Sequence, residues 1–173
     1  MSAARPQGSI PVGVVVERRN AASPWLDTVW RSVSLLSGMP EAAPWTMLSA
    51  SEDVATFYVG TVRLALYEAE TEHYRNNLAT DTPSVWVALR PTGAVPPYEL
   101  CAVTANPSEG EAFTQAGDDL VDAVPMPPPL RRLIEAFVAE HHVEPQPTHR
   151  RNRADADLQV SARQRPLRRE QSR

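Results

Sequence analysis

The residues most able to do chemistry lie close together near the middle of the chain. Their side chains carry carboxylate, imidazole, phenol, guanidinium and amide groups: Glu68, Glu70, Glu72, His73, Tyr74, Arg75 and Asn77. Neighbouring carboxylates push one another's pKa apart, and general acid–base catalysis uses such pairs. The same composition is typical of a solvated charged helix face, and we favour that interpretation. If the chain has a polar binding site, we expect it in this segment.

The motifs of common catalytic sites are absent from the sequence. It contains no G-x-S-x-G, no G-x-G-x-x-G and no H-E-x-x-H, and a P-loop is excluded because the chain has no lysine. The only cysteine, Cys101, lies in an apolar segment, where an inert buried thiol is expected. One cysteine also excludes an internal disulfide and a four-cysteine zinc site. The sequence predicts no catalytic residue and favours a binding protein over an enzyme.

A pair of histidines near residue 140 offers the other ligand-like grouping. His141 and His142 follow Glu140, and imidazole and carboxylate are common metal ligands. Adjacent residues of a helix point about 100° apart, so the two rings cannot easily hold one ion. Histidine at a helix C-terminus is favoured by the helix dipole alone. We expect helix capping here, with no metal site and no cofactor.

Four tryptophans are available for the core or for a contact surface. Trp30, Trp45 and Trp86 lie in apolar segments, whereas Trp25 directly follows Pro24, the last residue of a predicted loop. Two or three indoles are expected in the core or at its rim, each with a partner for its N–H. An exposed Trp25 would mark a surface that contacts another protein.

Charge divides the chain near residue 143. Residues 1–143 contain nine arginines and seventeen acidic residues, and residues 144–173 contain eight arginines and four acidic residues. The tail has few large apolar residues, so we expect it to be disordered. Its candidate contact residues are Arg150, Arg151, Arg153, Arg168 and Arg169. They could bind phosphates or an acidic partner, or remain solvated; nucleic acid is disfavoured because no aromatic residues are interleaved.

The elements that would position these residues are mostly strands. Alternating and β-branched patterns predict strands at residues 10–19, 30–36, 45–50, 55–59, 61–67, 84–90 and 98–104. Helices are expected at 68–78 and from Asn106–Pro107 to Gly117, and 118–124 is an edge strand or a loop. The fold class is α+β: a mostly antiparallel β-sheet or half-open barrel, covered by a C-terminal amphipathic helix.

That last helix is the clearest element. Leu130, Leu133, Ile134, Phe137 and Val138 recur at helical spacing and form one apolar stripe over residues 130–142. We therefore expect a flexible start (1–9), one globular domain (10–143) and a disordered basic tail (144–173). The longest apolar run is too short to cross a membrane and no secretion signal is visible, so a cytoplasmic protein is expected.

With these residues in view, the chain resembles a bacterial family known as domain of unknown function 3305. The resemblance rests on residues 10–19, on Ser23-Pro24-Trp25 with Val29-Trp30, on Glu70-Thr71-Glu72 and Tyr74-Arg75-x-Asn77-Leu78, on Thr104-Ala105-x-Pro107, on Val124-Pro125-Met126-Pro127 and on Phe137-Val138 with His141-His142-Val143. It spans residues 10–143, the expected globular domain.

The resemblance implies a role beside a known enzyme. Members of the family are typically encoded next to a molybdenum-dependent formate dehydrogenase and a ferredoxin-like iron–sulfur protein. This implies an accessory protein in assembly, maturation or regulation, with a dehydrogenase subunit or its iron–sulfur partner as the protein that it binds. The family supplies no catalytic residue. Two alternatives stay open: a small-ligand binder or enzyme using residues 70–77, and nucleic-acid binding through the tail.

Overall fold

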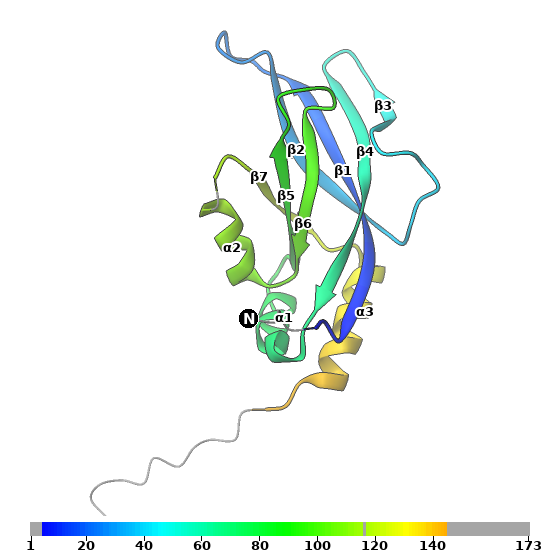
Figure 1. Cartoon of the computed structure of the whole chain (residues 1–173), viewed down its shortest axis with the longest axis vertical. Helices are drawn as coiled ribbons and strands as arrows, with labels where there is room; N and C mark the ends of the chain where they lie inside the picture. Colours follow the sequence, from blue (N-terminus) through cyan, green and yellow to red (C-terminus); the bar gives the residue numbers. More distant parts are fainter. Residues whose placement is uncertain (1–4, 116, 145–173) are drawn as a thin grey trace, which may run out of the picture. The chain divides into compact units, whose positions relative to one another are not determined.

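The strands of the computed structural model form two antiparallel sheets (Figure 1). Residues 5–115 and 117–144 are described. The first sheet, in the order β2-β1-β4-β3, contains β1 (Gly8–Asn20), β2 (Thr28–Ser37), β3 (Thr46–Ala50) and β4 (Val54–Leu66). The second, in the order β6-β5-β7, contains β5 (Ser84–Pro91), β6 (Tyr98–Thr104) and β7 (Leu120–Pro125).

The two longest strands, β1 and β4, pair with each other along their length. Val12, Val14 and Val16 of β1 are fully buried, because alternate residues of a strand point to the same face. Gly60 interrupts the pairing with φ +139°, and the register shifts beside it. Glycine suits such a bulge because it adopts positive φ without steric cost. The two strands predicted at 55–59 and 61–67 are therefore one continuous strand with an irregularity at Gly60.

The two sheets face each other around the core. β4 lies beside β6 and β2 lies beside β7, but no ladder joins the two sheets within the described residues, so the strands do not close into a barrel. One carboxylate connects the two sheets: Asp122 of β7 accepts a hydrogen bond from the backbone N–H of Ser32 in β2, at 2.7 Å. The expected antiparallel α+β class is confirmed, with two sheets in place of one.

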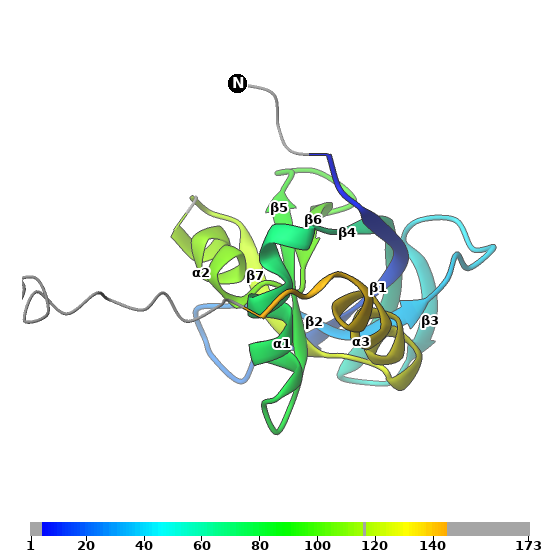
Figure 2. The same ribbon diagram turned by 90° about the horizontal axis from the view of Figure 1, so that it is seen from below.

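Helical segments gather mainly at one end of the sheets. They are the short 3-10 turn η1 (Glu68–Glu70), α1 (Thr71–Leu78), α2 (Pro107–Gln115) and α3 (Pro128–His141). Seen from below, α1 and α3 lie side by side (Figure 2). The apolar stripe of α3 is buried at Leu130, Ile134, Phe137 and Val138. The prediction was wrong for Leu133, which is 50% exposed.

The chain divides into two units at Val143, and every helix and strand named above belongs to the first. The predicted basic tail lies outside the described residues except for Glu144, and so do its five candidate arginines. No helix in the described part of the chain is long and apolar enough to span a membrane.

Candidate functional site

Three hairpin loops lie at the end of the sheets opposite α1 and α3 (Figure 1). They join β1 to β2, β3 to β4 and β5 to β6. The side chains of Trp25 and Leu26 in the β1–β2 loop are 89% and 59% exposed, and Val95 in the β5–β6 loop is 97% exposed. Apolar side chains held in solvent add nothing to the folding of the chain. This loop end is therefore the first candidate for a contact surface.

Hydrogen bonds give the β1–β2 loop a defined conformation. The N–H of Ala21 donates to the carbonyl of Asp27 at 3.2 Å and closes the loop. At its base, Asn20 donates from its backbone N–H to the carbonyl of Asp53 at 2.9 Å and from its amide to the carboxylate of Asp53 at 3.3 Å. These bonds tie the loop to the β3–β4 turn. Trp25 is thus displayed from an ordered loop.

A groove of about 540 Å³ lies beside this loop and is called the β1–β2 groove below. Its lining residues are Glu17, Arg19, Asn20, Ala21, Ala22, Ser23, Leu26, Val29 and Arg31. The strand register places Arg19 opposite Val29 and Glu17 opposite Arg31, so these four side chains share one face of the sheet.

The charges of the β1–β2 groove are not balanced. Arg19 donates two hydrogen bonds to the Glu17 carboxylate, at 2.9 and 3.0 Å. Arg31 has no ion pair within the described residues. Sequence reasoning singled out Trp25 and missed Arg31. The alternation of Val29 and Arg31 along β2 was the available signal, because it places both on the solvent face.

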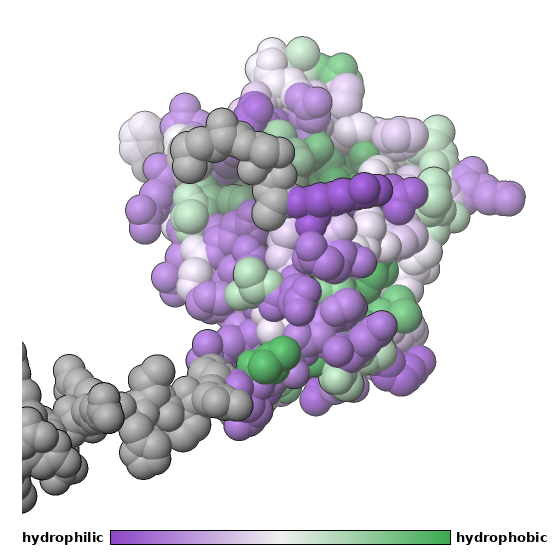
Figure 3. Space-filling model, turned by 60° about the horizontal axis from the view of Figure 1, so that its bottom comes forward, coloured by the Kyte–Doolittle hydropathy of each residue, from purple (hydrophilic) through white to green (hydrophobic). Residues whose placement is uncertain are grey.

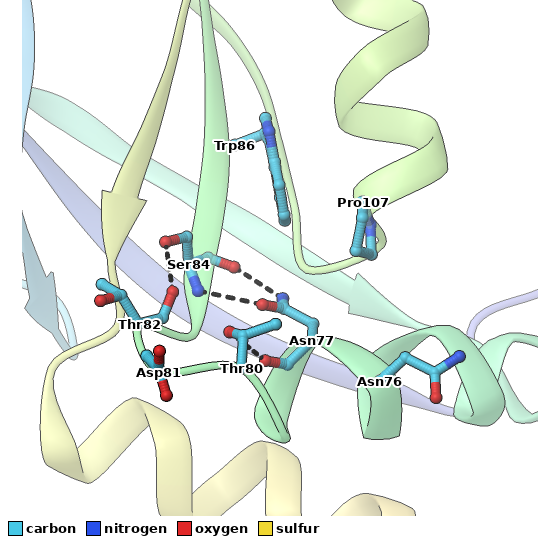
Figure 4. A pocket seen from close by; sticks show the side chains of 8 residues that line it. All are labelled: Asn76, Asn77, Thr80, Asp81, Thr82, Ser84, Trp86 and Pro107. Carbon is cyan, nitrogen blue, oxygen red and sulfur yellow. Dashed lines mark hydrogen bonds between the residues drawn. The ribbon is translucent and has the colours of Figure 1, made fainter.

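A second cavity, of about 600 Å³, lies between α1 and β5 (Figure 4). Asn77 lines it, but its amide is engaged within the fold: it donates to the carbonyls of Ser84 and Ala105 at 2.7 and 2.8 Å and accepts from the N–H of Ser84 at 3.1 Å. Trp86 and Pro107 form an apolar wall. Asn77 therefore joins α1 to β5 and to the start of α2 and has no amide donor left for a ligand.

The other residues of the polar segment 68–77 separate into buried and exposed ones. The hydroxyl of Tyr74 donates to Glu70 at 2.7 Å and accepts from the N–H of Tyr67 at 3.1 Å. Burial, together with this bond to Glu70, raises the pKa of Tyr74 above its ordinary value of 10. Glu72, His73 and Arg75 are exposed on the surface of α1. Figure 3 brings this end forward and shows mostly hydrophilic residues, with apolar ones in separate patches. The segment does not converge on one pocket.

The histidines at the end of α3 have structural contacts. The hydroxyl of Thr71 donates to the Glu68 carbonyl at 3.0 Å, so at its 3.1 Å contact with His142 Nδ1 it accepts. The ring of His141 packs on Phe137 with centroids 4.4 Å apart. In the described part of the chain no three His, Cys, Asp or Glu side chains gather as metal ligands would.

The remaining aromatic residues and the cysteine have places in the fold. Trp30 packs against Trp45, Phe57 and Tyr98 with ring centroids 5.7–6.1 Å apart. This aromatic cluster is partly buried against the core. Cys101 is half-buried in β6. Among the tryptophans, Trp25 is the one displayed to solvent.

The comparisons with known proteins give one match. The model of a family described as "Protein of unknown function (DUF3305)" matches residues 11–152. No curated protein and no solved structure matches the chain.

Proposed function

The chain belongs to the family described as protein of unknown function (DUF3305), and we propose that it is a non-catalytic accessory protein that acts by binding another protein. The observation that supports this most is the exposure of Trp25 on an ordered loop. Tryptophan is among the residues that contribute most to binding in protein interfaces. An ordered loop also loses little conformational freedom when it binds.

The partner in this proposal is a formate dehydrogenase subunit or its iron–sulfur partner. This part of the proposal comes from the resemblance to the family, whose members are encoded beside those proteins. The role is assembly, maturation or regulation of the enzyme. The loop end supports contact with a large partner, because its exposed apolar residues come from more than one loop.

Recovery of the dehydrogenase with the tagged full-length chain tests the proposal. In cells that naturally produce both proteins, we expect the dehydrogenase to co-purify in stoichiometric amount with the chain, identified by its own mass spectrum. Trp25→Ala should reduce the recovered enzyme at least about tenfold, as for an interface hot spot. Leu133→Ala is the matched control, since it also removes an exposed apolar side chain, at the opposite end.

Two results would contradict the proposal. One is the absence of stoichiometric dehydrogenase together with unchanged enzyme activity in a strain that lacks the chain. The other is equal recovery with both variants, which would remove Trp25 from the contact surface.

A further inference from the structure

The β1–β2 groove combines an apolar wall with one guanidinium that has no ion pair in the part of the chain that the structure describes. Leu26 and Val29 supply large apolar surface, being 59% and 39% exposed. Arg19 makes the ion pair with Glu17, and Arg31, which lies opposite Glu17 in the strand pair, makes no ion pair within the described residues. Asp27 lies in the same loop but does not line the groove. The groove therefore carries two arginines and one acidic residue.

We propose that the β1–β2 groove binds an extended protein segment in which an apolar residue and an acidic residue lie two positions apart. The apolar side chain packs on Leu26 and Val29, and the carboxylate pairs with Arg31. This inference rests on the proposed function and deepens it, because it names the chemistry of the segment that the loop end recognises.

The geometry of the strands supports this occupant. Arg31 and Val29 are two residues apart on β2, so their side chains point to the same face about 6.5–7 Å apart along the strand. Residues two positions apart on an extended segment span a comparable distance and point to the same side. A guanidinium pairs with a carboxylate through two parallel hydrogen bonds, which is stronger and more directional than a contact with a neutral amide.

The charge balance also selects against other partners. A basic segment would place a third positive charge beside Arg31 and Arg19, with Glu17 as the one carboxylate among the lining residues. A bare phosphate would pair with Arg31 and leave the apolar wall exposed. A segment that is both apolar and acidic satisfies both parts of the groove.

Two short peptides that differ only in a side-chain carboxylate or amide test the inference. We would titrate the ¹⁵N-labelled full chain with acetyl-Gly-Phe-Gly-Asp-Gly-amide and with its Asn counterpart, following amide shifts by NMR at low salt. We expect both to shift amides of residues 20–31, with millimolar affinity as for small ligands. The Asp peptide should bind about fivefold tighter, because only its carboxylate makes the charge-assisted pair.

Variants assign the effect to Arg31. Arg31→Gln should make the two peptides equal, while Arg132→Gln, an exposed arginine on α3, should leave the fivefold preference unchanged. The dispersion of the amide spectrum verifies that each variant is folded. Inorganic phosphate should not match the Asp peptide at equal concentration.

Three outcomes would overturn the inference: no shifts in residues 20–31, equal affinity for the two peptides with the native chain, or a preference that survives Arg31→Gln. Its failure is separable from that of the proposed function. If the dehydrogenase co-purifies through Trp25 but the chain does not prefer the Asp peptide, only the proposed chemistry of the groove is wrong. If the chain prefers the Asp peptide but no dehydrogenase co-purifies, only the proposed partner is wrong.

Discussion

At the scale of single residues, Asn77 shows how one buried amide can hold three segments together. It is 2% exposed, and its amide makes three hydrogen bonds to the backbone of Ser84 and Ala105. A buried backbone N–H or C=O group without a hydrogen-bond partner destabilises the fold. The amide of Asn77 supplies that pairing where β5 begins and β6 ends, which explains why an asparagine stands inside α1.

Asn77→Ala should therefore destabilise the fold with no direct effect on the loop end. We expect the free energy of unfolding to fall by roughly 2–4 kcal/mol, because buried backbone groups lose their partners. Urea unfolding measures the change. Asn76→Ala, an exposed neighbour on the same helix, should cost less than about 0.5 kcal/mol. A similar small loss for Asn77→Ala would contradict the structural role.

Tyr74 gives a prediction for alkaline pH. Its pKa is raised in the fold, first by burial and then by the hydrogen bond to Glu70. Because the folded pKa lies above the ordinary value of 10, Tyr74 stabilises the fold fully below pH 10, and this contribution is lost as the pH rises further. The difference in unfolding free energy between the native chain and Tyr74→Phe should be smaller at about pH 11 than at about pH 8. A constant difference would be the contrary result.

The polar segment could be recognised from the sequence, but not the role of each residue in it. Carboxylates, a phenol and an amide within ten residues indicated a charged helix face or a polar site. Which of them are buried depends on segments that fold against α1, such as Ala105, which is 28 positions from Asn77. Local pattern contains no information on partners so distant along the chain.

At the scale of elements, α2 and β5 are fitted to each other through a glycine. A Cβ on Gly110 would overlap the indole ring of Trp86. Alanine is normally favoured over glycine inside a helix by about 1 kcal/mol. At position 110 glycine is required instead, because the Trp86 ring lies where the Cβ of any other residue would be.

Gly110→Ala should thus lower the free energy of unfolding by about 1–3 kcal/mol, the usual cost of overpacking. Thermal or urea unfolding would detect it. In the Trp86→Ala background, which removes Cγ and the ring, the overlap is gone, and the same substitution should become neutral or stabilising. An unchanged stability on Gly110→Ala in the native background would show that the ring does not pack on the helix.

The apolar stripe of α3 makes a second prediction at this scale. Ile134 is fully buried, whereas Leu133 is half-exposed. Ile134→Ala should cost about 2–5 kcal/mol, as for a large-to-small change in a core, and Leu133→Ala less than about 1 kcal/mol. Equal losses measured by urea unfolding would contradict the orientation of α3.

The elements themselves were largely predictable. β-Branched runs marked β1, β5 and β6, and the helical spacing of apolar residues marked α3. The exposure of Leu133 was not predictable, because a stripe of five residues is wider than the surface that α3 buries. How much of α3 is buried depends on its neighbour α1, and the apolar spacing within α3 contains no information about that neighbour.

At the scale of the whole first unit, the two ends of the sheets differ. One end has α1 and α3 side by side (Figure 2), and the opposite end displays Trp25, Leu26 and Val95 from its loops (Figure 1). The sequence indicated antiparallel strands but not their division into two sheets. That division depends on contacts between strands that are far apart in the chain, such as the hydrogen bond from the Ser32 N–H to Asp122.

Hydrogen exchange of the full-length chain, with and without purified formate dehydrogenase, tests the central claim most directly. The account predicts slower exchange at residues 20–31 when the enzyme is present, loss of that protection with Trp25→Ala, and no change in α1 or α3. Protection confined to the α1–α3 end, or identical exchange with and without the enzyme, would contradict it.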